Sequence, residues 1–275
     1  MKCVKAISHG GASILNAIPT GIGSAFALNL NVEVEVCESM ENHFPSHAIE
    51  EVYNTIKAKY CQQLQAVSVK VRSEIPAGGG LKSSSAVTNA TAAALSKLCA
   101  LKVSPYEILR LAVEASKKAR VTITGALDDA AASLLGGLVI TNNHEMKILD
   151  RMALPELPVI VIPRSGRRYG FEEIKDRLSS LKSQFKVIEE RLLDNKDLWN
   201  VMTLNGILVA SALGYSTEPI TQALKRGAIA ASISGNGPSY VIVAEKDNYQ
   251  EIYELFKNEG AVLSNITNEK AYYAD

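Results

Sequence analysis

Residues 75–87 (IPAGGGLKSSSAV) constrain the fold more than any other part of the chain, because three glycines and three serines stand together. A flexible linker is the simplest interpretation of such a run, but its flanks argue against one. Residues 26–36 and 67–72 alternate apolar and polar side chains, as half-buried strands do. The residues after the serines that share one helical face are Val87, Ala90, Thr91, Ala94, Leu95 and Leu98. The pattern therefore predicts a strand, a glycine loop and a helix N-terminus, in that order.

A helix N-terminus preceded by glycines favours an anion, because its N–H groups are free and its dipole end is positive. We therefore interpret the run as a phosphate-binding loop, with a structural turn as the alternative. It is not a Walker A loop: Lys82 precedes Ser83, but Gly78 stands too few residues before it. The GxGxxG dinucleotide pattern does not fit either.

The composition limits the class of protein. The chain has 275 residues, of which 47% are hydrophobic, enough for two modest domains or one large one. Lys and Arg number 29 and Asp and Glu 29, and only 6% of residues are aromatic, so we expect no nucleic-acid partner. No apolar run is long enough to span a bilayer, and the N-terminus does not read as a signal peptide. We expect a cytoplasmic protein with no membrane partner.

The cysteines and histidines indicate no metal site. Cys3, Cys37, Cys61 and Cys99 stand far apart with no CxxC pair. A disulfide framework is unusual in a chain of this size, so we expect reduced thiols. The four histidines have neither a nucleophile partner nor zinc-ligand spacing.

The rest of the chain predicts alternating helices and strands with one break. Residues 104–107 (SPYE) form a capping box with proline at the first helical position. A short helix is expected after Asp129 and a strand over 138–141. Prolines near residue 155 interrupt the pattern, so we expect an N-terminal domain over 1–155 and a C-terminal domain over 156–275. In the second domain we expect strands at 158–163, 228–234, 239–245 and 261–266, and helices at 171–194, 197–213, 218–226 and 248–259.

Three ordered motifs resemble those of the GHMP kinases, the family that includes galactokinase and homoserine and mevalonate kinases. Residues 76–86 (PAGGGLKSSSA) are similar to its phosphate loop, Pro-x-x-x-Gly-Leu-x-Ser-Ser-x-Ala. Asp129 with the following Gly136-Gly137 resembles its middle motif, and residues 234–239 (SGNGPS) resemble its third. Three further segments are similar to archaeal shikimate kinases, which share this fold: 16–26 (NAIPTGIGSAF), 121–130 (VTITGALDDA) and 204–208 (LNGIL).

The resemblance implies a two-domain α+β GHMP kinase fold, with a ribosomal S5 domain 2-like N-terminal domain and a ferredoxin-like C-terminal domain. It implies phosphorylation of shikimate to shikimate 3-phosphate by ATP with Mg²⁺, in aromatic amino acid biosynthesis. The residues expected to bind ATP are Pro76, Ala77, Gly78, Gly79, Gly80, Leu81, Lys82, Ser83, Ser84, Ser85, Ala86, Gly235, Asn236 and Gly237.

Within that family pattern, Asp129 is the expected general base, because phosphoryl transfer needs a carboxylate to accept the hydroxyl proton. Asp128 would bind the substrate or hold Asp129 in place; alternatively, the aspartates cap the helix that begins there. Ser84 matches the Mg²⁺-binding serine, and Glu114 is the candidate second ligand. The alternative for Glu114 is a surface pair with Lys118.

The expected substrate-binding residues carry hydroxyl, amide or carboxylate groups that suit a polyhydroxy acid. They are Asn16, Thr20, Ser24, Thr124 and Asp128; the alternative for the hydroxyl residues is an ordinary strand or turn position.

Two cations are missing from this scheme. Many GHMP kinases carry a lysine or arginine in the first motif, whereas residues 9–13 here are HGGAS. For Lys82, the alternative to a phosphate contact is a solvated side chain, as most loop lysines have. For the shikimate carboxylate, Arg164, Arg167 and Arg168 form the densest basic cluster, and a solvated loop is the alternative.

Two other interpretations stay open. One is another kinase of the same fold, homoserine kinase being the nearest, because a fold does not determine a substrate. The other is a catalytically silent ligand sensor, against which the intact Asp129 and Ser84 argue. The oligomeric state is also open, a homo-oligomer included.

Overall fold

Two antiparallel sheets organise the chain in the computed structural model, which describes residues 2–166 and 169–274. The larger sheet has the strand order β10-β1-β2-β4-β5, with β3 also paired to β2, and the smaller has the order β7-β8-β6-β9. The strands of the larger sheet are β1 (Cys3–Leu15), β2 (Ile22–Ser39), β3 (Ala66–Ser73), β4 (Leu138–Asn142), β5 (Lys147–Met152) and β10 (Tyr272–Ala274). Those of the smaller sheet are β6 (Pro158–Ile162), β7 (Ala230–Ile233), β8 (Tyr240–Val243) and β9 (Val262–Asn265).

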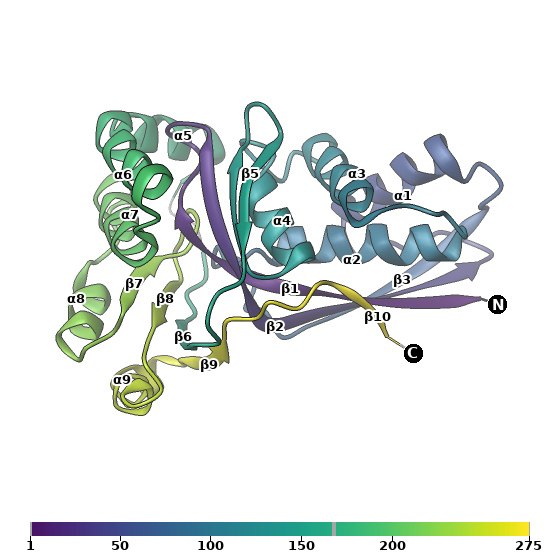
Figure 1. Cartoon of the computed structure of the whole chain (residues 1–275). Coiled ribbons are helices and arrows are strands. Elements are labelled where there is room, and N and C mark those ends of the chain that lie inside the picture. Colours follow the sequence, from purple (N-terminus) through teal and green to yellow (C-terminus); the bar gives the residue numbers. More distant parts are fainter. Residues whose placement is uncertain (1, 167–168, 275) are drawn as a thin grey trace.

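The helices of the first half of the chain lie on one face of the larger sheet (Figure 1). They are α1 (His47–Tyr60), α2 (Ser83–Leu98), α3 (Pro105–Lys118) and α4 (Leu127–Leu135). Helix α2 is central: its predicted apolar face is buried, except that Val87 is only partly so, and Asn89 and Ser96 are buried as well. The capping box of α3 is confirmed, since Ser104 accepts from the Glu107 N–H and Glu107 accepts from the Ser104 N–H.

The helices of the second half cover the smaller sheet and the end of the larger one. They are α5 (Phe171–Ser179), α6 (Lys182–Asn195), α7 (Leu198–Leu213), α8 (Glu218–Lys225) and α9 (Tyr249–Phe256). The predicted helix over 171–194 is therefore two helices. The short helix expected after Asp129 begins earlier, at Leu127, so both aspartates lie in its first turn, where acidic side chains complement the helix dipole.

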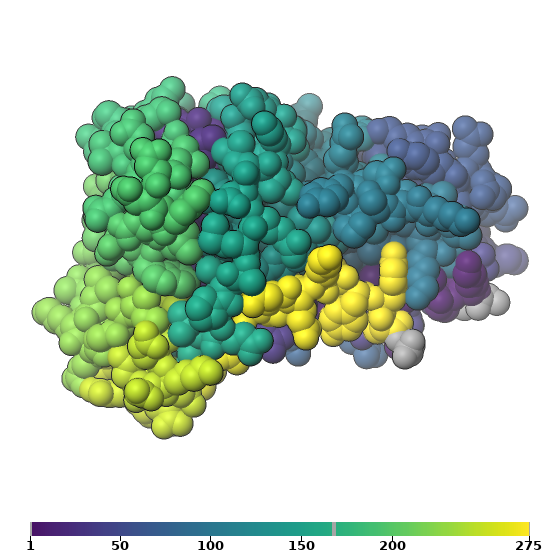
Figure 2. Space-filling model, viewed as in Figure 1, coloured from purple at the N-terminus to yellow at the C-terminus, as the bar shows by residue number. Residues whose placement is uncertain are grey.

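The end of the chain returns to the first sheet. The predicted strand over 261–266 is confirmed as β9, but it is not the last element. Residues Tyr272–Ala274 pair antiparallel with Lys5–Ile7 of β1. Figure 2 shows these last residues crossing the face of the N-terminal half. The division near residue 155 stays a prediction, and β10 is a feature that it did not include.

The expectation of reduced thiols is wrong. Cys3 and Cys37 stand opposite each other in the β1–β2 ladder and form a disulfide, with their Cα atoms 4.0 Å apart. Cys61 and Cys99 follow the last turns of α1 and α2 and form a second one. The sequence indicates neither pair, because the cysteines are 34 and 38 residues apart and only the β1–β2 register and the packing of the helices bring the sulfurs together.

Among the helices that the structure describes, none combines the length and apolar character that crossing a membrane requires.

Candidate active site

The glycine loop between β3 and α2 is held where the two sheets meet. The Gly11 N–H of β1 donates to the Leu81 carbonyl at 3.1 Å. From the turn between β7 and β8, the Ser239 N–H donates to the Gly79 carbonyl at 3.2 Å, and the Ser234 hydroxyl donates to the Gly80 carbonyl at 2.9 Å. The order strand, loop and helix is thus confirmed, and the third motif lies directly against the loop.

Two of the three glycines are required by packing. A Cβ on Gly80, whose φ is +82°, would lie 2.1 Å from the Ser234 carbonyl oxygen, and one on Gly79 would lie 2.0 Å from the Ser239 hydroxyl. Only Gly78 has open space around the Cβ position. The absence of side chains at Gly79 and Gly80 therefore allows the β7–β8 turn to pack against the loop. At Gly78 it leaves space for a phosphate.

A cavity lies beside this loop, and most of the predicted site residues line it. Those that do are Asn16, Pro76, Gly78, Gly79, Gly80, Leu81, Lys82, Ser83, Ser84, Ser85, Thr124, Asp128, Asp129, Gly235 and Asn236. The first turn of α2 opens on this cavity; its N-cap position, Lys82, provides no side-chain cap, so the N–H groups of the three serines are available to an anion.

Six predicted residues are not brought to the cavity wall: Ala77, Ala86, Gly237, Thr20, Ser24 and Glu114. Ser24 is fully buried in the sheet and its hydroxyl donates to the Val139 carbonyl at 2.8 Å. The Thr20 hydroxyl accepts a hydrogen bond from the Ile22 N–H, so it stabilises the turn in which it lies. For both, the strand-and-turn alternative describes the position better.

Glu114 lies on the surface of α3, between two lysines. Its carboxylate pairs with Lys59 and, at 3.1 Å, with Lys118. The hydrogen bond from Lys59 is the main cause that holds the pKa of Glu114 below its ordinary value. The structure therefore favours the surface pair and does not bring Glu114 to Ser84.

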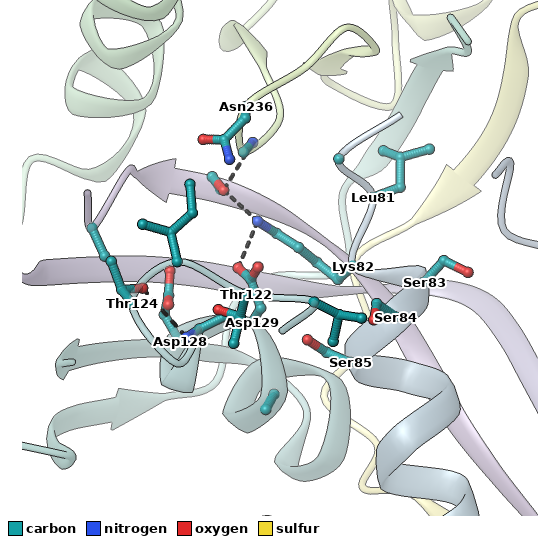
Figure 3. Close-up of a pocket in the computed structure, with 18 of the residues that line it drawn as sticks. Leu81, Lys82, Ser83, Ser84, Ser85, Thr122, Thr124, Asp128, Asp129 and Asn236 are labelled. Atoms are coloured by element: carbon teal, nitrogen blue, oxygen red, sulfur yellow. Dashed lines mark hydrogen bonds and ion pairs between the residues drawn. The ribbon is translucent and has the colours of Figure 1, made fainter. Parts of the chain in front are cut away.

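Lys82 is buried, which argues against the alternative of a solvated side chain. Its side chain is only 3% exposed, and Nζ lies 2.6 Å from Asp129 Oδ1 and 2.6 Å from the Ser13 hydroxyl. Figure 3 shows the side chain leaving the start of α2 and crossing the cavity to Asp129. The Lys82 backbone is left-handed, with φ 65°, which non-glycine residues seldom adopt.

The first motif makes room for this lysine. A Cβ on Gly11 would lie 2.8 Å from the Phe26 carbonyl oxygen and 3.1 Å from Lys82 Cγ, so glycine suits this position and leaves space beside the aliphatic stem. Residues 9–13 contain no lysine or arginine, but Lys82 brings a cation beside them from the glycine loop. Sequence reasoning missed Ser13 and the inward turn of Lys82, because nothing in the local pattern distinguishes this lysine from a solvated one.

Asp128 is buried beside Asp129. Burial, and then the Asp129 charge, raise the pKa of Asp128 to about 7, while Lys82 and a hydrogen bond from Asn143 oppose the rise. A Cβ on Gly23 would lie 2.6 Å from Asp128 Oδ2, so this carboxyl occupies space that a glycine leaves. The pair thus combines an ion-paired carboxylate, Asp129, with a carboxyl that exchanges its proton near neutral pH.

Asn16 joins three parts of the molecule. Its Nδ2 donates to the Gly235 carbonyl at 3.1 Å and to Asn236 Oδ1 at 2.9 Å, and its backbone N–H donates to Asn205 Oδ1 at 2.9 Å. The Asn16 amide is therefore occupied with fixing the third motif against β1, and Asn205 in α7, within the predicted LNGIL segment, supports it.

The basic cluster does not reach the cavity where it is described. The Arg164 guanidinium pairs with Glu259, and the Arg164 backbone N–H donates to the Ser239 hydroxyl. Arg167 and Arg168 lie outside the described residues.

The comparisons with known proteins agree with this geometry. Residues 43–137 match the GHMP kinases N terminal domain. A shikimate kinase of Methanothermobacter thermautotrophicus is 34% identical over 275 residues, covering 95% of each chain. One of Methanobrevibacter smithii is 32% identical over 276 residues, covering 93% of each chain. The structure of a homoserine kinase from Cytophaga hutchinsonii superposes with a TM-score of 0.74 at 21% identity, covering 100% of this chain and 98% of that one, which shows the fold.

The α+β fold, the glycine loop at a helix N-terminus and the third motif against it agree with the near full-length similarity to curated relatives, and this chain is a GHMP kinase. Such kinases take their phosphoryl group from ATP. Within that class, the near full-length similarity places the chain in the archaeal shikimate kinase family.

Proposed function

We propose that this chain transfers a phosphoryl group from ATP to a hydroxyl of shikimate, giving ADP and shikimate 3-phosphate. One observation carries the proposal: the Asp129 carboxylate, held by Lys82, shares a cavity with the open N-terminus of α2. A carboxylate within reach of a phosphate site is what transfer to an alcohol requires. The similarity to shikimate kinases supports the choice of alcohol.

The proposed chemistry uses this chain's own groups as follows. Asp129 accepts the proton of the substrate hydroxyl while that oxygen forms its bond to phosphorus and the bond to the leaving ADP oxygen breaks. Lys82 holds Asp129 toward the reacting atoms and offsets negative charge that builds there. The serine N–H groups at the start of α2 bind the phosphates of the donor. Asp128 binds a second substrate hydroxyl, with its proton available below about pH 7.

Mg²⁺ fits the residues that line the cavity. The described residues hold no cluster of three acidic, histidine or cysteine ligands. Mg²⁺ is usually bound mainly by phosphate oxygens, with one or two protein oxygens, and the cavity wall offers the serine hydroxyls of α2. The Ser84 hydroxyl, in the first turn of α2, would hold it; Glu114 would not. When bound, Mg²⁺ neutralises phosphate charge. A cytoplasmic location follows from the same proposal, because ATP is the donor.

The test is ADP release with ATP and Mg²⁺ in the presence of shikimate, homoserine or mevalonate. We expect turnover with shikimate at least about a hundredfold above the other two in kcat/KM, since a site built to hydrogen-bond its substrate rejects analogues strongly. Turnover with homoserine instead would retain the kinase and replace its substrate. Shikimate binding without ADP formation would favour the ligand sensor and contradict the proposal.

A further inference from the structure

Asn143 stands just after β4 and is not among the residues that line the cavity, yet its side chain contacts two residues that are. It is 2% exposed. Its Nδ2 donates to Asp128 Oδ1 at 2.8 Å and to Thr124 Oγ1 at 3.1 Å. Both hydrogens of the amide are therefore committed to groups of the cavity wall.

Asn143 is itself held firmly. Its backbone N–H donates to the Gly21 carbonyl at 2.8 Å, and its Oδ1 accepts from the Thr141 hydroxyl at 2.7 Å. Gly21 has a φ of +87°, and a Cβ there would lie 2.0 Å from a ring carbon of His144. The turn after β4 thus rests on the start of β2 through a glycine, and this contact fixes the side chain that reaches the cavity wall.

The contacts of Thr124 decide what its hydroxyl can do. Thr124 Oγ1 accepts from Asn143 and also from the Ala126 N–H at 3.3 Å, which occupies both of its lone pairs. Among the described residues, nothing accepts the Thr124 hydroxyl hydrogen. Because Thr124 lines the cavity, that hydrogen is available to a ligand there. The hydroxyl is consequently a donor, suited to a carboxylate or hydroxyl oxygen.

Asp128 is restricted in the same way. Its Oδ1 accepts one hydrogen bond from Asn143, and its Oδ2 lies next to Gly23. One buried amide therefore sets the orientation of two groups, one from α4 and the other from the irregular segment before it. An amide suits this position because it offers two donors, whereas an aspartate or a leucine offers none.

We propose that Asn143 is a positioning residue for the acceptor substrate: by donating to Thr124 and Asp128 together, it presents the Thr124 hydroxyl as a hydrogen-bond donor to an oxygen of that substrate. The inference rests on the proposed function only in naming the substrate as shikimate. It assigns Asn143 no contact with ATP, which binds at the other end of the cavity.

The test is a double-mutant cycle between Asn143→Ala and Thr124→Val. Each should raise KM for shikimate about tenfold or more, as the loss of a buried hydrogen bond does, and leave KM for ATP within about twofold. Because Asn143 acts partly through Thr124, the double variant should fall short of the product of the two single effects. Thr124→Ser, which keeps the hydroxyl, should retain the wild-type KM.

Asn142→Ala is the matched control. Asn142 lies in the same turn and its Oδ1 accepts from the His144 and Glu145 N–H groups, but it contacts neither Thr124 nor Asp128. It should lower the melting temperature and leave KM for shikimate unchanged. If Asn143→Ala does not fold, Asn143→Leu, which has a similar size and offers no donor, should show the same rise in KM.

A purely structural role would appear as a lowered melting temperature with an unchanged KM, and would overturn the inference. So would fully multiplicative effects, or an equal rise in KM for ATP. Calorimetric binding of shikimate to Asp129→Asn, with and without Asn143→Ala, gives a readout that does not need turnover. If the wild type turns over homoserine instead, the proposed function fails, and the same cycle measured with homoserine still tests Asn143.

Discussion

The two ends of the cavity are built differently. The end proposed to bind phosphate, residues 76–86 with the 234–237 turn, is held through its backbone: carbonyls of Gly79, Gly80 and Leu81 accept hydrogen bonds from the turn of the second sheet and from β1. The end proposed to bind the acceptor, Thr124 and Asp128 with Asn143 behind them, is held by side chains from three segments. A contiguous glycine run can specify the first end, whereas the second exists only after the chain has folded.

The ion pair that joins the two ends should give the largest effect. Asp129→Asn should lower kcat about 10³-fold or more, and Lys82→Met about 10²-fold, in line with losing a base or one electrostatic stabiliser. Because Lys82 acts through Asp129, the double variant should be nearly as active as Asp129→Asn alone. Steady-state kinetics of the four proteins measure this.

Lys118→Met is the control for that cycle, since Lys118 also pairs with a carboxylate, that of Glu114, but outside the cavity. It should leave kcat unchanged. If Lys82→Met raised KM for ATP and left kcat unchanged, Lys82 would bind only phosphate, and the two ends of the cavity would act independently.

Substitutions in the glycine loop should separate packing from phosphate approach. Gly78 and Gly80 both have positive φ, so alanine costs each about 1–2 kcal/mol of backbone strain. Only at Gly80 would the new Cβ also meet the Ser234 carbonyl. Gly80→Ala should therefore lower the free energy of unfolding by at least about twice as much as Gly78→Ala in urea denaturation. Equal losses would show that the second sheet does not depend on this contact.

The smallest effect is a pH dependence at the acceptor end. The pKa of Asp128 is raised to about 7 from 3.8, so between these values the folded protein holds a proton that the unfolded chain has released. The raised pKa of Asp128 therefore stabilises the folded protein fully below about pH 4, and this stabilisation is lost as the pH rises through 7. Between pH 4 and pH 8, the free energy of unfolding of Asp128→Asn should rise by at least about 1 kcal/mol relative to that of the wild type, since one pKa unit corresponds to about 1.4 kcal/mol. A constant difference across that range, in unfolding curves, would contradict the raised pKa.

Much of the fold could be predicted where the local pattern is strong. The alternation in 26–36, the serine-proline start of α3 and the proline-flanked β6 each determine their element within a few residues. Strand β1 was not predicted, because Ser8 to Ser13 (SHGGAS) breaks the alternation, and β10 is too short to carry a signal.

The candidate site follows the same rule. The glycine loop before a helix could be predicted from contiguous residues, whereas Asp129 was proposed from the resemblance of its motif to the GHMP kinases. The direction of the Lys82 side chain could not, because it depends on Gly11 and Ser13 in another strand. Asn143 had no signal, since an asparagine after a strand is an ordinary turn residue. Both disulfides depend on register and packing in the same way.

The late position of β10 has a consequence for how the protein is made. Strand β1 begins at Cys3, and the strand that covers one of its edges begins at Tyr272. During synthesis, the N-terminal sheet can form with that edge open long before its cover leaves the ribosome. An uncovered edge is a template for pairing with other chains. Residues Tyr272–Ala274 cover that edge in the folded chain, so deleting them should increase aggregation of the newly made chain.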